Sequence, residues 1–260
     1  MNLLAVTLSG ETDWEGFSQA VRFLVRQGVS PDRVIWRTAS HREIDLFDAV
    51  ETAAAADLPT VAALQLPASF VETARLAFLH KAHARFDLLY RTAWRVVEDR
   101  RRWQNPLASD RMRLERMGHQ VRREMHWMKA FVRFRRLVDA AGQDHHVAWF
   151  EPQHYIVEAV APFFVGRFGA MRWALLTPRV SASWDGNALS FKAGARKEDA
   201  PPADAGEALW IAYYQSIFNP TRLKVRALKR GMPVRYWANL SEAASTGPLT
   251  RRYPEGKPHD

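Results

Sequence analysis

Helical periodicity dominates the middle of the sequence. Apolar residues recur with the spacing of an amphipathic helix over 69–103 and again over 110–139. Asn105 and Pro106 interrupt the first pattern, and Gly142 ends the second. The spacing therefore predicts a helical middle segment that contains one long helix over residues 110–139.

Short apolar runs on either side of this region indicate strands. The first half opens with a strand, helix, strand pattern over 3–36, and an alanine-rich connection follows. In the second half, Asp185-Gly186-Asn187 has the composition of a hairpin turn between two such runs. We expect an α+β fold in which the helical middle, with its long basic helix, is combined with a small, mainly antiparallel sheet. Residues 1–244 are expected to form a single α+β domain, and residues 245–260 a flexible tail.

The positive charge of the chain is localised. The chain carries 37 Lys and Arg against 28 Asp and Glu, a formal net charge of +9. Residues 91–136 hold fourteen basic and five acidic residues, and residues 219–237 hold six basic residues and no acid. Most of the basic residues are arginines, whose planar guanidinium suits phosphate. A polyanionic partner, with DNA first, is one interpretation, and ordinary solvated helix faces are the other.

The long helix would place a basic stripe opposite a broad apolar face. At about 100° per residue, six side chains of this segment fall on one narrow arc, namely His119, Arg122, His126, Lys129, Arg133 and Arg136. Like charges on such a stripe repel one another unless an anion lies on it. Aromatic residues interleave with basic ones over 210–237, which suits either base stacking or core packing. We predict a nucleic-acid-binding surface formed by His119, Arg122, His126, Lys129 and Arg133, helped by Arg222 and Lys224. Plain solvation of the stripe, and a catalytic or metal-binding use of its histidines, are the alternatives.

Glu124 projects into the apolar face of the predicted helix. An ionised carboxylate there is costly unless an Arg, a His or several backbone N–H groups pair with it. A structural ion pair and a general acid or base with a raised pKa both fit this position. Glu151 and His154 share a turn before the next helical pattern. The candidate catalytic residues are therefore Glu124, His126, Glu151 and His154.

The sequence lacks the residues and motifs of several kinds of chemistry. The absence of cysteine excludes disulfides, thiol nucleophiles and cysteine-ligated metal clusters. His119 and His126 are separated by about 10.5 Å of helical rise, which is too far for one metal ion. No phosphate-binding glycine-rich loop, nucleophile elbow, zinc-protease or dinucleotide-binding motif occurs. We therefore expect neither a metal site nor a cofactor.

The apolar runs of the chain are short. None approaches the roughly 18 residues that a membrane-spanning helix needs. Residues 1–8 lack the basic region and the long apolar stretch of a signal peptide. A cytoplasmic protein without a membrane partner is the expectation.

Four local motifs occur in combination. They are Glu124-x-His126-x-x-Lys129-x-Phe131-Val132-Arg133-Phe134, Glu151-Pro152-x-His154, Asn219-Pro220-x-Arg222-Leu223-Lys224 and Met232-Pro233-x-x-Tyr236-Trp237. Together they resemble the uncharacterised DNA metabolism protein family, whose members are often encoded beside a radical-SAM protein. They also resemble the amino-terminal module of proteins fused to a UdgX-type uracil-DNA glycosylase-like domain.

This resemblance extends to about Ala244 and implies a DNA-repair context. It makes residues 245–260 a possible linker to a glycosylase-like domain that this chain lacks. The cluster cysteines of that domain are absent. The chain itself is therefore not expected to bind or excise uracil as that domain does.

Three functional hypotheses follow. The first is a DNA-repair-associated accessory module that binds nucleic acid while a glycosylase-like or radical-SAM partner protein performs the chemistry. The second is an enzyme that acts on nucleic acid and uses Glu124, His126 and His154 as acid and base groups. The third is a protein-docking module whose basic face meets an acidic partner. Binding to nucleic acid would weaken steeply with salt, which separates the first hypothesis from the third.

Overall fold

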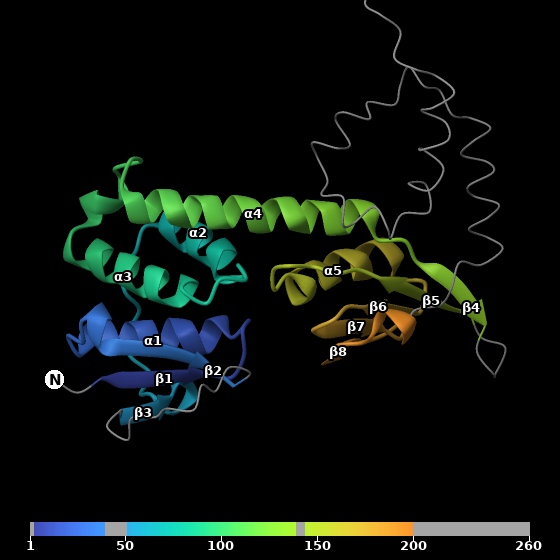
Figure 1. The fold of residues 1–260 in the computed structure, drawn as a ribbon, viewed down its shortest axis with the longest axis horizontal. Coiled ribbons are helices and arrows are strands. Elements are labelled where there is room, and N and C mark those ends of the chain that lie inside the picture. The colour runs from blue at the N-terminus through green and yellow to red at the C-terminus, as the bar shows by residue number, and fades with distance from the viewer. Residues whose placement is uncertain (1–2, 40–50, 139–143, 200–260) are drawn as a thin grey trace, which may run out of the picture. The chain divides into compact units, whose positions relative to one another are not determined.

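The computed structural model describes residues 3–39, 51–138 and 144–199 (Figure 1). Within these ranges, five α-helices and eight strands in two sheets confirm the α+β class. The residues group into two compact units. Unit 1 consists of Met1–Glu124 with Gln153–Ile156, and unit 2 of Met125–Pro152 with Val157–Asp260, as far as these ranges are described. The single domain over 1–244 stays a prediction, because residues 200–260, tail included, lie outside the described part.

Unit 1 contains a three-stranded sheet that is parallel throughout. Its strands are β1 (Leu4–Leu8), β2 (Val34–Thr38) and β3 (Glu51–Ala54), in the order β2-β1-β3. β1 pairs in parallel with both neighbours, and Val6 lies opposite Trp36. The structure differs here from the expected mainly antiparallel sheet, because a strand, helix, strand unit returns the chain in the same direction.

Helix α1 (Trp14–Arg26) connects β1 to β2 and packs on this sheet (Figure 1). The Asp13 carboxylate caps the helix by accepting from the backbone N–H of Gly16 at 2.8 Å and of Ser9 at 2.9 Å. Strand β3 lies in the alanine-rich segment that was expected to be a connection. Alanine has little intrinsic strand preference, so backbone pairing with β1 decides this strand.

The helical middle of the chain is confirmed as α2 (Ala68–Phe78), α3 (Arg85–Glu98) and α4 (Ser109–Phe131). Residues 79–84 form the turn between α2 and α3 and divide the first helical region in two. α3 packs against α1, α2 and β2. The centre of the core in unit 1 is a cluster of aromatic rings contributed by Phe17, Trp36, Phe78, Phe86 and Tyr90.

Helix α4 ends at Phe131 and not at residue 139, so the predicted boundary is wrong. The chain continues into strand β4 (Arg135–Val138), which pairs antiparallel with β5 (Asp144–Trp149). The apolar residues in this stretch fit a helical arc and a strand equally well, and pairing with β5 selects the strand. Arg136 therefore lies on a strand and not on the helical stripe.

Unit 2 contains a five-stranded sheet in the order β4-β5-β6-β7-β8. The remaining strands are β6 (Trp173–Leu176), β7 (Val180–Trp184) and β8 (Leu189–Ala193). Three of the four pairs are antiparallel, and β5 and β6 are parallel. Helix α5 (Val157–Phe168) makes the crossover between β5 and β6 and packs on the sheet (Figure 1). The sheet is therefore mixed, with mostly antiparallel pairing as predicted for this half.

The hairpin turn between β7 and β8 is confirmed. The Asp185 carboxylate accepts from the backbone N–H of Asn187 at 2.8 Å and of Ala188 at 2.7 Å. Gly186 has a φ of 99°, which residues with a Cβ rarely adopt. Because these interactions are local, the three residues Asp185-Gly186-Asn187 are sufficient to predict the turn.

Candidate functional site

The solvent-exposed side of α4 carries cations. Within this helix, all of which the structure describes, Glu115 is the one carboxylate whose side chain is substantially exposed, at 36%, and it is paired with Arg111. The exposed basic and imidazole side chains are Arg113, Arg116, His119, Arg122, Arg123, His126 and Lys129.

Two of the three acids of α4, Asp110 and Glu115, are paired with arginines. Asp110 pairs with Arg91 at 3.0 Å and Arg95 at 2.6 Å, both on α3. Burial alone would raise the pKa of Asp110, but the hydrogen bond and charge of Arg91, with the charge of Arg95, lower this pKa below its usual value. Glu115 accepts from Arg111 Nε at 2.8 Å. These carboxylates therefore do not neutralise the exposed side of the helix.

Four of the predicted stripe residues project from one side of α4. His119, Arg122, His126 and Lys129 follow one another at separations of three, four and three residues, which places them on one helical face. The Nζ atom of Lys129 also lies 5.2 Å from the ring centroid of Phe163. The face therefore combines guanidinium, ammonium and imidazole groups along about 15 Å of helix.

The predicted stripe is shorter than expected, because Arg133 lies beyond the end of α4. Its Nη1 donates to the carbonyl of Ala130 at 2.8 Å and of Val132 at 3.3 Å, so it satisfies acceptors at the helix terminus. Arg136 pairs with Asp144 at 2.7 Å across the β4 and β5 strands. Both arginines thus have local structural partners.

A second polar cluster lies in unit 1, around Glu124. This side chain is 1% exposed. Its carboxylate accepts from the backbone N–H of Gln153 at 2.9 Å and of His154 at 2.8 Å. Backbone donors were one of the expected ways to stabilise a carboxylate on the apolar face, and the structure confirms it. Glu124 thereby holds a segment from later in the sequence within unit 1.

His154 and His80 are both buried and lie face to face. Their ring centroids are 4.6 Å apart, with the rings tilted by 36°. His154 Nδ1 accepts from the backbone N–H of Lys81 at 3.2 Å, and His80 Nδ1 accepts from that of Ala82 at 3.1 Å. His80 Nε2 donates to Gln120 Oε1 at 2.8 Å. In these hydrogen bonds, each imidazole uses Nδ1 as an unprotonated acceptor, as a neutral ring does.

Arg85, the first residue of α3, holds the turn over residues 79–84 from its C-terminal end. The side chain is fully buried, and its Nε donates to the carbonyl of Phe78 at 2.6 Å. Its Nη2 pairs with Glu11 Oε2 at 2.5 Å, and its Nη1 donates to the Ala82 carbonyl at 3.2 Å. The guanidinium also lies 4.9 Å from the ring centroid of Tyr155. Arg85, His80 and His154 together order the turn over residues 79–84.

The structure brings together two of the four predicted catalytic residues, Glu124 and His154. His126 and Glu151 are exposed residues of unit 2, and Glu151 accepts from Trp149 Nε1 at 2.7 Å. Sequence reasoning missed His80 and Arg85, because neither stands at a motif spacing from the others. The predicted Arg222 and Lys224, with the aromatic residues over 210–237, lie outside the described residues.

In the described ranges, no group of three or more His, Asp or Glu side chains is placed to hold a metal ion. None of the helices that the structure describes has the length and apolar character needed to cross a bilayer.

Burial makes His80 a source of pH-dependent stability. Burial is the main cause that lowers the pKa of His80 from 6.5, and the charges of Arg85 and Lys81 also lower it, against the opposing effects of Gln120 and Glu124. Because the unfolded chain then binds the proton more readily, the free energy of unfolding should fall as pH drops below about 6.5 and level off below the folded pKa. We expect the stability difference between the wild type and His80→Gln to shrink from pH 7.5 to pH 5.5 in urea unfolding.

The matched variant for this experiment is His126→Gln, which changes an exposed histidine. Because the side chain is exposed, the replacement should change the free energy of unfolding at pH 7.5 by about 0.5 kcal/mol or less. A stability difference for His80→Gln that is the same at both pH values would contradict the role of His80.

Comparison with known proteins shows that most of the helices and strands described above lie within one family domain. Residues 83–242, more than half of the chain, match the family described as a domain of unknown function (DUF4130). The match begins just before α3, so it includes α4, the Gln153–Ile156 segment and the described strands of unit 2, but not the parallel sheet. No curated protein and no solved structure matches the chain. The chain therefore belongs to the DUF4130 family.

Proposed function

We propose that this chain is a DNA-repair-associated accessory module that binds nucleic acid through the exposed face of α4. The observation that carries the proposal is the composition of that face, on which seven exposed side chains are basic or imidazole groups and the one partly exposed carboxylate, Glu115, is paired with Arg111. A solvated surface helix normally mixes both signs, because like charges on neighbouring turns destabilise it. A polyanion on this face would remove that repulsion.

The spacing of the cations suits a phosphate backbone. Arg122 and Lys129 are seven residues apart, which corresponds to about 10.5 Å along the helix. Duplex DNA carries one phosphate per about 1.7 Å of axis, so several phosphates lie within reach of this face. Arginine and lysine contacts to phosphate supply affinity and orientation, and they do not read sequence. The module would therefore position a partner enzyme on nucleic acid.

The identity of that partner rests on the motif resemblance. The motifs around Glu124 and His154 resemble proteins associated with a uracil-DNA glycosylase-like domain or a radical-SAM protein. We propose that such a protein performs the chemistry, with DNA as the favoured nucleic acid. The enzyme hypothesis has less support, because Glu124 and His154 Nδ1 both accept hydrogen bonds from backbone N–H groups that they hold in place.

Fluorescence anisotropy across a salt series tests the proposal. Labelled single-stranded and double-stranded DNA, RNA and polyglutamate are titrated with the full chain and with Arg122→Gln/Lys129→Gln. For duplex DNA, we expect the slope of log affinity against log salt to decrease by up to about 1.8 in the double variant, at about 0.9 per lost phosphate contact. Circular dichroism checks that the helix content is unchanged.

The matched control is Arg26→Gln/Arg167→Gln, which removes the same charge from exposed positions on α1 and α5. This control should keep the wild-type salt slope. Equal losses in the two double variants, or no DNA binding at low salt, would overturn the proposal. Tighter binding to polyglutamate than to any nucleic acid would favour the protein-docking hypothesis instead.

A further inference from the structure

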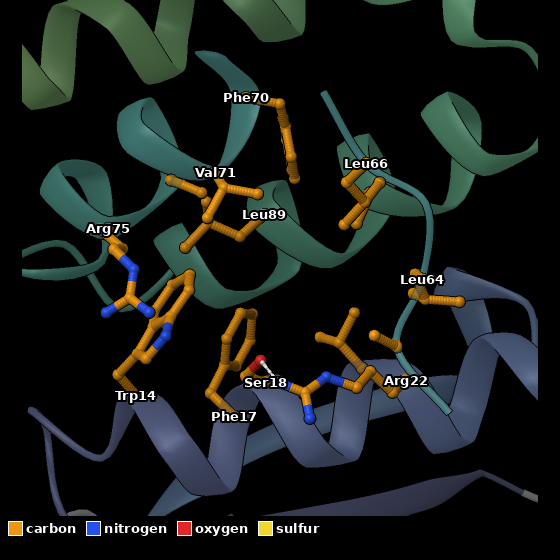
Figure 2. Close-up of a pocket in the computed structure, with 14 residues that line it drawn as sticks. Trp14, Phe17, Ser18, Arg22, Leu64, Leu66, Phe70, Val71, Arg75 and Leu89 are labelled. Atoms are coloured by element: carbon orange, nitrogen blue, oxygen red, sulfur yellow. Dashed lines mark hydrogen bonds between the residues drawn. The ribbon is translucent and has the colours of Figure 1, made fainter. Parts of the chain in front are cut away.

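A cavity of about 180 Å³ opens between α1, α2 and α3 in unit 1 (Figure 2). Its walls are mostly apolar. The lining includes the rings of Trp14, Phe17 and Phe70 and the aliphatic side chains of Leu64, Leu66 and Val71. All of these residues belong to unit 1. No residue of α4 lines the cavity, so the site is distinct from the basic face of α4.

Two arginines are the charged residues of this cavity. Arg22 Nη2 donates to Ser18 Oγ at 2.8 Å, and the Arg75 guanidinium lies 4.9 Å from the Trp14 ring centroid. Figure 2 shows both side chains running toward the aromatic rings. Within the described part of the chain, neither guanidinium has a carboxylate partner, whereas Arg85, Arg91, Arg95 and Arg111 all do.

The lining defines the chemical class of the ligand. No Asn, Gln, Asp or Glu lines the cavity, so the lining side chains that can hydrogen-bond a ligand are Ser18, the Trp14 indole N–H and the two guanidinium groups. Apart from the Ser18 hydroxyl, all of these groups are donors, which suits an anionic ligand. An apolar cavity of about 150 Å³ accommodates benzene, so a single ring fits the space. Guanidinium groups bind carboxylate or phosphate with strong, charge-assisted hydrogen bonds. We propose that this cavity binds a small molecule made of one apolar ring and one carboxylate or phosphate group.

Calorimetric titration of the full chain tests the proposal with probes that separate the two features. Phenylacetate and phenyl phosphate carry both the ring and the anion, benzyl alcohol carries only the ring, and acetate carries only the anion. We expect saturable binding of at least one of the first two, and at least tenfold weaker binding of benzyl alcohol and of acetate. The better of phenylacetate and phenyl phosphate identifies the anionic group.

Variants then locate the binding site. Arg22→Gln and Arg75→Gln should each weaken binding of the better probe by about tenfold, and Val71→Phe should abolish it by filling the cavity. Arg26→Gln, one turn further along α1 and outside the lining, is the matched control and should bind like the wild type. Wild-type affinity in both arginine variants, or equal affinity for benzyl alcohol, would overturn the proposal. Absence of saturable binding to any probe would overturn it as well.

Discussion

Replacement of Arg85 by methionine should lower the free energy of unfolding by about 3 to 5 kcal/mol, as is typical when one partner of a buried ion pair is removed. The variant removes the Arg85 guanidinium from the Glu11 carboxylate, whose side chain is only 12% exposed. It also removes the donors to the carbonyls of Phe78 and Ala82. Urea unfolding followed by tryptophan fluorescence and circular dichroism measures the change.

Arg91→Met is the matched control for this prediction. Arg91 also pairs with a carboxylate, but its side chain is 35% exposed and its partner Asp110 keeps Arg95. The loss should therefore be about 1 kcal/mol or less. Arg85→Met/Glu11→Met removes both charges and should recover part of the stability. Equal losses in the free energy of unfolding for Arg85→Met and Arg91→Met would contradict the prediction that a buried ion pair is costlier to break than an exposed one.

Replacement of Glu124 by alanine should have the second large effect. The variant leaves the backbone N–H groups of Gln153 and His154 without their carboxylate acceptor. Because a hydrogen bond to a charged group contributes about 1.5 to 3 kcal/mol, we expect a loss of about 3 kcal/mol in the free energy of unfolding. The segment over residues 153–156 should loosen first. Hydrogen exchange of these two amides should accelerate by about a hundredfold, the equivalent of this free energy.

The comparison for Glu124→Ala is Glu115→Ala on the same helix. Glu115 forms an i,i+4 pair with Arg111, and its side chain is 36% exposed. Its removal should cost about 0.5 kcal/mol or less and leave exchange at residues 153–154 unchanged. Unchanged exchange at those amides in Glu124→Ala would contradict the role of Glu124 in holding the segment.

The local features of the fold could be predicted because each depends on neighbours in the sequence. The amphipathic pattern of α4, the cap at Asp13 and the hairpin at Asp185 use interactions within about four residues. The end of α4 could not be predicted in this way. Pairing of Arg135–Val138 with β5, a tertiary interaction, competes there with an equally good helical pattern.

The sequence by itself determined the α+β class, the helical middle and the basic face of α4, since periodicity and charge are properties of the chain. It also marked Glu124 as a carboxylate that needs partners. Only the tertiary structure decided that those partners are the backbone N–H groups of Gln153 and His154. It also decided two other long-range contacts. His154 meets His80 and Arg85 meets Glu11 across 74 positions each. Contacts between such distant positions depend on the packing of whole elements, which no local spacing records.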